Sequence, residues 1–251
     1  MSACFTHSCM SGCLAGLAPS FSSPMTNPNS LVDAAAALAL SFAEAAAEHD
    51  RSGAPPAAQF DALKAAGLLR VNIGRDDGGV GAGLAVSCAI VGEVACGDPS
   101  VALILAMYYC QHAIIARAGH TGSGDWPPEL ARCLKDASIR GRALLNAAQV
   151  EPGLDSPSYG GLPDTIARRD GDGWRLSGHK IYVTGAPLLS WINVLARTDE
   201  DVPRLGHFLV PRDAPGERIL ETWDPIGMRA TASRDVVFEN VELEANDAVA
   251  L

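Results

Sequence analysis

The spacing of apolar residues changes once along this chain, near Arg142, and the change limits the folds that are open to it. Before this point apolar residues recur every three to four positions, as on one face of a helix. After it they alternate with polar residues, as in half-buried strands. Helices followed by strands predict an α+β fold, with a helical domain over residues 31–142 and a small antiparallel β-barrel or sandwich over residues 143–251.

The first half is expected to contain five helices, because five apolar segments are bounded by helix start and stop signals. Proline pairs precede two of them, and Asp98-Pro99-Ser100 begins another. The expected helices cover residues 31–49, 55–66, 84–96, 98–118 and 127–139. Their short connections predict antiparallel packing.

The second half contains seven segments with the alternation of strands. These are residues 143–149, 165–169, 174–184, 191–197, 206–210, 218–221 and 234–239. The turn Asp170-Gly171-Asp172-Gly173 separates two of them and is typical of a tight hairpin, because its glycines accept the positive φ that such turns require.

Composition and motifs exclude several classes of protein. A formal net charge of −10 and only three lysines argue against a nucleic-acid partner or an anionic membrane surface. No Cys-x-x-Cys pair is present, so no metal site is expected, and Cys88, Cys96 and Cys110 are interpreted as buried thiols within helices. The glycine-rich loop 72–83 lacks the Gly-x-Gly-x-x-Gly spacing of a dinucleotide site. We expect a soluble, cytoplasmic protein that acts on a small molecule, with residues 1–30 as a disordered tail.

Four segments in a fixed order resemble the acyl-CoA dehydrogenase family. They are Asp77-Gly78-Gly79-Val80-Gly81, Val150-Glu151-Pro152-Gly153, Lys180-Ile181-Tyr182-Val183-Thr184 and Trp223-Asp224-Pro225-Ile226-Gly227-Met228-Arg229. The resemblance runs from Leu31 to the end and covers the family's helical N-terminal domain and β middle domain. It implies that the family's C-terminal helical bundle is missing from this chain.

The resemblance implies a flavin, FAD or alternatively FMN, held by two of these segments. The residues that it assigns to the cofactor are Gln149, Val150, Ser156, Tyr182, Val183 and Thr184. Tyr182 would flank the ring, and the Thr184 hydroxyl would hydrogen-bond it. The family's catalytic base is usually a glutamate of the missing domain, so no catalytic residue is assigned here. The expected reaction is α,β-dehydrogenation of an acyl-CoA thioester with hydride transfer to FAD, with weak or no activity for this chain alone.

Departures from the family pattern leave two alternatives open. Val150 stands where the family has a flavin-contacting threonine, and Gly185 replaces an asparagine. These changes resemble the branch of two-component monooxygenases of the dibenzothiophene type, which use reduced flavin and O2, and there His112 is a candidate proton donor. The third possibility is a non-catalytic remnant. Implied partners are an acyl-CoA or other small substrate, an electron-transfer flavoprotein or flavin reductase, and a second copy of the chain once a C-terminal domain completes it.

Overall fold

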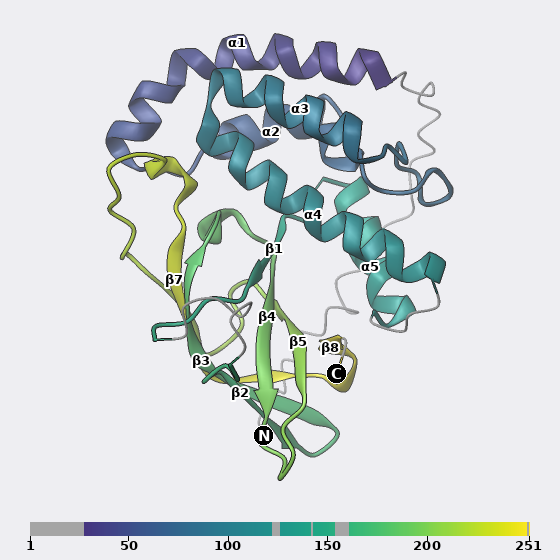
Figure 1. Ribbon diagram of the computed structural model, residues 1–251, viewed down its shortest axis with the longest axis vertical. Helices are drawn as coiled ribbons and strands as arrows, with labels where there is room; N and C mark the ends of the chain where they lie inside the picture. The colour runs from purple at the N-terminus through teal and green to yellow at the C-terminus, as the bar shows by residue number, and fades with distance from the viewer. Residues whose placement is uncertain (1–27, 122–125, 142, 154–160, 250) are drawn as a thin grey trace, which may run out of the picture.

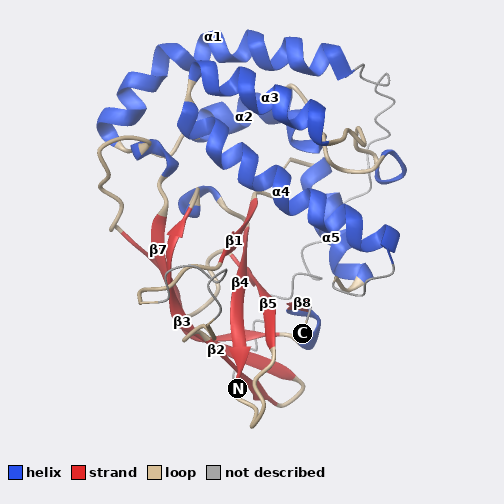
Figure 2. Ribbon diagram, viewed as in Figure 1, coloured by secondary structure: helices blue, strands red, loops and turns tan. Residues whose placement is uncertain are grey.

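The computed structural model describes residues 28–121, 126–141, 143–153, 161–249 and 251. Within these residues, the five α-helices lie at one end and the strands lie at the other (Figures 1 and 2). The helices are α1 (Pro28–Ser52), α2 (Ala57–Ala65), α3 (Leu84–Gly97), α4 (Pro99–Thr121) and α5 (Pro128–Ile139). Each expected helix is present, and the α+β fold class is confirmed. Most of the expected tail, residues 1–27, lies outside the described residues.

The helical end is held together by buried polar contacts as well as by apolar packing. Asp98, which is 2% exposed, accepts the backbone N–H groups of Ser100 and Val101 and so caps α4. The other carboxylate oxygen of Asp98 lies 2.8 Å from His49 Nδ1 on α1. One aspartate therefore both starts α4 and attaches it to α1.

The strands form one eight-stranded sheet that is mostly antiparallel. They are β1 (Leu145–Ala148), β2 (Ile166–Asp170), β3 (Gly173–Val183), β4 (Trp191–Thr198), β5 (Leu205–Pro211), β6 (Glu217–Leu220), β7 (Arg234–Leu243) and β8 (Ala248–Val249). Their order is β6-β7-β3-β2-β4-β5-β8, and β1 pairs with β4. The β2–β3 hairpin turns at residues 170–173 as expected.

Two of the pairings are parallel, which the sequence analysis did not anticipate. β1 lies beside the first half of β4, and β2 lies beside its last two residues, Arg197 and Thr198. The two short strands therefore share one edge of β4. Alternation of apolar residues reports which face of a strand is buried but not the direction of its neighbour, so this arrangement was not readable from the pattern.

The main hydrophobic core runs continuously from the helices into the sheet. It includes Leu63 and Leu105 from the helices and Trp174 and Phe208 from the strands, all of which are almost fully buried. The rings of Trp174 and Phe208 meet edge to face, with their centroids 5.3 Å apart. A smaller cluster under α5 includes Leu134 and Leu145. Because one core spans both halves, the two halves are packed as a unit.

The interpretation of three cysteines as buried thiols was wrong. Cys88, Cys96 and Cys110 are exposed, whereas Cys133 on α5 is buried. Cys88 and Cys96 lie on α3 and Cys110 lies on α4, and both helices are apolar on nearly all sides, so their composition did not reveal which face is covered. Stretches of α1 and α4 are also long and apolar enough to cross a membrane. The core helices of soluble proteins have the same length and composition, and 56% of the α4 stretch is buried within the fold.

We predict that Gly97→Ala destabilises the fold and that Gly92→Ala does not. A methyl group at Gly97 would lie 2.2 Å from the carbonyl oxygen of Ala39, so α1 and α3 would have to separate. We expect a loss of about 1–3 kcal/mol in the free energy of unfolding. Nothing lies within 4 Å of a methyl group at Gly92 on the same helix, and alanine there should gain up to about 1 kcal/mol. Urea denaturation measures both, and equal effects would contradict this account of the helix contact.

Candidate functional site

The two segments that the sequence analysis assigned to a cofactor lie side by side. Ile181 N–H donates to the carbonyl oxygen of Val150 at 2.9 Å. The Asn146 side chain, on β1, donates to the carbonyl oxygen of Thr184 at 3.0 Å. These contacts join the end of β1 to the end of β3, and we call residues 149–151 together with residues 181–184 the rim.

A buried ion pair fixes the rim from beneath. Lys180 Nζ lies 2.5 Å from Glu151 Oε1, and the two residues are 0% and 3% exposed. The carboxylate also accepts the backbone N–H groups of Asp164 at 2.5 Å and Thr165 at 3.1 Å. Burial alone would raise the pKa of Glu151, but the hydrogen bonds from Lys180 and Thr165 lower it below its ordinary value. Lys180 therefore neutralises the charge of Glu151, and hydrogen bonds occupy both of its carboxylate oxygens. Glu151 is unsuited to abstracting a proton.

The pairing of Glu151 with Lys180 was not predicted from the sequence, where Glu151 appears only within the segment Val150-Glu151-Pro152-Gly153. A signal for it was present, because Lys180 lies on the same alternating face of β3 as the buried Trp174 and Leu176. A lysine on a buried face requires a partner of opposite charge. The partner's identity could not be read, since Glu151 lies in a different segment.

Tyr182 projects from the rim in a strained conformation. Its φ is +58°, in the left-handed region, and the β3–β7 register shifts between Lys180 and Val183. A bulge of this kind re-aims one side chain, and Tyr182 is 60% exposed. Its ring meets that of Trp223 edge to face, with centroids 6.1 Å apart. Trp223, to which no role was assigned from the sequence, thus forms an aromatic pair with a predicted site residue.

The hydroxyl of Thr184 is held by a second hydroxyl. Ser233 Oγ, at the start of β7, donates to Thr184 Oγ1 at 3.1 Å. The next backbone N–H, of Gly185, donates to the carbonyl oxygen of Thr231 at 2.8 Å. Thr184 as a whole is partly buried, and the contact with Ser233 fixes the position of its hydroxyl.

The other predicted site residues are placed differently. Gln149 is exposed, and its amide nitrogen lies 3.4 Å from Nε2 of His207 on β5, so its side chain turns toward β5. Val183 is 0% exposed, so it offers no accessible surface to a ligand. Ser156 lies outside the described residues.

His112 does not lie at the rim. It is 2% exposed on α4, and its Nε2 lies 2.9 Å from Ser138 Oγ on α5. Nδ1 is buried and has no hydrogen-bond partner among the described residues. Burial lowers the pKa of His112 to about 4, so the imidazole is neutral near pH 7. These contacts describe a core histidine that joins two helices rather than an accessible proton donor.

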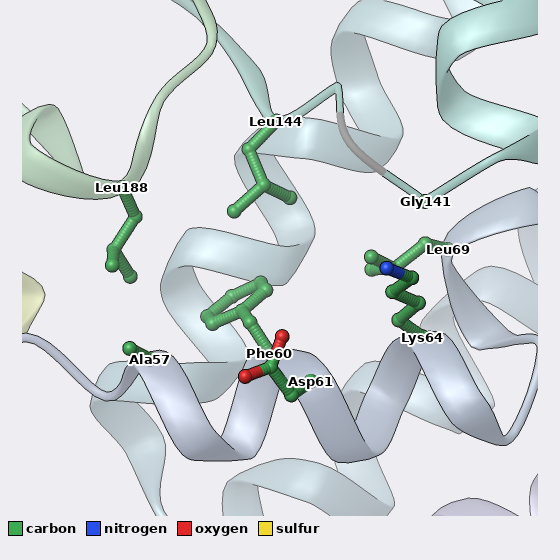
Figure 3. A pocket seen from close by; sticks show the side chains of 8 residues that line it. All are labelled: Ala57, Phe60, Asp61, Lys64, Leu69, Gly141, Leu144 and Leu188. Carbon is green, nitrogen blue, oxygen red and sulfur yellow. The ribbon is translucent and has the colours of Figure 1, made fainter.

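A cleft of about 190 Å³ lies between α2 and the segments around Leu144 and Leu188. Figure 3 shows Phe60, Asp61 and Lys64 of α2 facing Leu144 and Leu188 across it. None of the predicted site residues lines this cleft. It is therefore separate from the rim, and its apolar walls continue the main core.

The rim has the features that a flavin requires. The pair of exposed Tyr182 and partly buried Trp223 suits the flat apolar ring, and the Thr184 hydroxyl, two residues away from Tyr182, suits its polar edge. A metal ion would need a different set of groups, and no three His, Cys, Asp or Glu side chains within the described ranges come together to bind one.

We predict that Lys180→Met destabilises the protein strongly. It would leave Glu151 charged and buried without its partner, at a cost of about 3–5 kcal/mol in the free energy of unfolding. The double variant Lys180→Met/Glu151→Gln removes that charge and should regain at least about 1 kcal/mol. Urea denaturation at pH 7 compares them. A double variant no more stable than Lys180→Met would show that the pair is not the cause.

Stability should also fall on acidification because of His112. Its folded pKa of about 4 lies below the ordinary value of about 6.5, so only the unfolded chain takes up a proton between these values. Stability from this group is fully present above pH 6.5 and is lost as the pH falls toward 4, by up to roughly 3 kcal/mol. His112→Gln should flatten this part of the pH profile of unfolding. An unchanged profile in His112→Gln would contradict the assignment.

Comparison with known proteins places both halves in one family. Residues 29–132 match the model of the acyl-CoA dehydrogenase N-terminal domain, and residues 149–241 match that of the acyl-CoA dehydrogenase middle domain. Putative acyl-CoA dehydrogenase YdbM from Bacillus subtilis (strain 168) is 31% identical over 214 residues, which are 85% of this chain and 54% of YdbM. Amino sugar nitrososynthase RubN8 from Streptomyces rubradiris is 33% identical over 215 residues, 82% of this chain and 47% of RubN8.

Solved structures show the same fold. KijD3 in complex with FMN and a dTDP-linked amino sugar has a TM-score of 0.76 and 29% identity, covering 92% of this chain and 56% of KijD3. The dibenzothiophene monooxygenase TdsC from Paenibacillus sp. A11-2 shares the fold, with a TM-score of 0.75 and 24% identity, over 88% of this chain and 53% of TdsC. The chain spans about half the length of these relatives. Because its helices and its sheet match the family's first two domains in order, the chain belongs to the acyl-CoA dehydrogenase family.

Proposed function

We propose that this chain is the flavin-binding part of a flavin-dependent oxidoreductase and that the flavin ring lies on the rim. The observation that carries the proposal is the exposed, strained Tyr182, paired with Trp223 and two residues away from the fixed Thr184 hydroxyl. Backbone strain of this kind clusters at ligand sites, where the surrounding structure holds it in place. FMN in the complex of KijD3 supports the same choice of cofactor, and FAD, used by the family, is the alternative.

The residues of the rim and their neighbours Lys180 and Trp223 have distinct tasks in this proposal. Tyr182 and Trp223 cover one side of the ring and exclude water from it. The Thr184 hydroxyl hydrogen-bonds its polar edge, and the Glu151–Lys180 pair keeps the two segments in register. The flavin itself supplies two-electron transfer to or from the substrate.

The first candidate reaction is α,β-dehydrogenation of an acyl-CoA. The match to both family domains and to YdbM supports it. This reaction needs a carboxylate base, and Glu151 cannot serve because Lys180 and two backbone N–H groups occupy it. No residue of this chain is assigned as the base in this proposal, and an electron-transfer flavoprotein would be the partner that accepts the electrons.

The second candidate is oxygenation with reduced flavin and O2. Similarity to the nitrososynthase RubN8 favours it, because conversion of an amine to a nitroso group adds oxygen to nitrogen. Val150, which carries no hydroxyl at the rim, departs from the dehydrogenase pattern and agrees with this alternative. A flavin reductase would then supply the reduced cofactor. In either case we expect a soluble cytoplasmic enzyme.

We predict that the 251-residue chain binds FMN or FAD weakly and that Tyr182→Ser weakens this binding about tenfold, because an aromatic contact worth about 1.4 kcal/mol is lost. Val202→Ser is the matched control, since Val202 is an exposed apolar residue in the β4–β5 turn. Quenching of flavin fluorescence during titration measures both. Absence of quenching by the wild-type chain at any concentration up to millimolar would contradict the proposal, as would equal effects of the two variants.

Anaerobic mixing of the flavin-loaded chain with acyl-CoA thioesters separates the two reactions. Bleaching of the oxidised flavin by a thioester supports dehydrogenation. Substrate oxidation that requires externally reduced flavin and O2 supports oxygenation.

A further inference from the structure

Three hydroxyl groups form a hydrogen-bonded chain that begins at Thr184 and leads into the protein. Ser233 Oγ lies 3.1 Å from Thr184 Oγ1 and 2.8 Å from Thr231 Oγ1. Thr231 Oγ1 in turn lies 2.8 Å from the carbonyl oxygen of Met228. Thr231 and Ser233 are 0% and 3% exposed, so water does not compete for their protons.

The hydrogen bonds among these three hydroxyl groups can run in either of two directions, because each hydroxyl has one proton and can both donate and accept. When Ser233 donates to Thr184, the proton of Thr184 is free to be donated to a ligand. When the chain is reversed, Thr184 donates to Ser233, Ser233 to Thr231, and Thr231 to the Met228 carbonyl. Thr184 can then only accept a hydrogen bond from a ligand. No atom other than hydrogen moves between the two orientations.

The carbonyl at the inner end of the chain tolerates both orientations. Met228 C=O also accepts the backbone N–H of Thr231 at 3.1 Å and the indole N–H of Trp223 at 3.3 Å. It therefore keeps two donors when the Thr231 hydroxyl turns away, and no buried acceptor is left unpaired. The two orientations should differ little in free energy in the absence of ligand.

A flavin presents opposite requirements in its two redox states. N5 of the oxidised ring carries a lone pair and accepts a hydrogen bond, whereas N5 of the two-electron-reduced ring carries a proton and donates one. A residue with a fixed donor matches only one of these states. A hydroxyl whose orientation can reverse matches both.

We propose that the Thr184–Ser233–Thr231 chain reverses its orientation with the redox state of the flavin, so that Thr184 donates to the oxidised ring and accepts from the reduced ring. Thr231 and Ser233 are thus positioning residues that act through Thr184. This inference rests on the proposed flavin site and adds to it two buried residues that no sequence motif assigned.

The test is the affinity of Thr231→Val for FMN in each redox state. Valine keeps the shape of threonine but removes the acceptor for the Ser233 proton, which only the reversed orientation needs. Binding of oxidised FMN should change less than about twofold. Binding of dithionite-reduced FMN under anaerobic conditions should weaken about tenfold, because a buried proton is left without an acceptor. The potential of the bound two-electron couple should fall by about 30 mV, the equivalent of that factor.

Two further variants make the result specific. Thr231→Ser retains the hydroxyl and should restore wild-type affinity for reduced FMN. Ser233→Ala removes the acceptor for Thr184 itself and should repeat the selective loss without altering Thr231, which keeps the test valid if Thr231→Val does not fold. Equal weakening of both redox states, or no change, in wild-type-like folded variants would overturn the inference while leaving the flavin site intact. If the wild-type chain binds FMN in neither state, both the inference and the proposed function fail.

Discussion

The buried contact between Glu151 and Lys180 is the interaction on which the rest of the site depends. Removing two charges from water costs free energy. They are tolerated here because each charge compensates the other and two backbone N–H groups hydrogen-bond the carboxylate oxygens. The pair joins the segment after β1 to β3. The segments that carry the hydroxyl of Thr184 and the ring of Tyr182 are therefore held by an ionic contact that is almost fully buried.

The rim combines pieces that are far apart in the sequence. Tyr182 receives its aromatic neighbour from the loop before η5 (Arg229–Thr231), and Thr184 receives its hydrogen bond from Ser233, just before β7. The helical half contributes by covering the sheet, since η5 also contacts α1 and α4. A flavin at this place would meet a surface whose apolar and polar parts are both supported by residues 223–233, because the Trp223 indole and the Thr231 hydroxyl donate to the same Met228 carbonyl oxygen.

Much of the fold followed from periodicity and punctuation, while the features that depend on contacts between segments did not. Asp98 was correctly interpreted as the start of a helix because capping is local, and the hairpin at residues 170–173 was found from its glycines. The parallel pairing of β1 and β2 with β4 has no local signal. The same holds for Trp223, whose sequence context is a loop and whose ring partner lies about forty residues earlier, and for the Thr231–Ser233 hydroxyls. Resemblance identified the rim segments, but burial decided what each side chain can do, as Val183 and Gln149 show.

The shared edge of β4 affects how the protein folds while the ribosome synthesises it. β1 and β2 both emerge before β4, yet each needs that later strand as its parallel neighbour. β1 therefore lacks its sheet partner while the hairpin and β4 are being made. Parallel pairing between segments so far apart in the sequence is also slow to form. The helical half has mostly nearby partners and has no such delay. Synthesis therefore passes through a stage in which folded helices precede an unfinished sheet, and chaperones would find their binding sites in that interval.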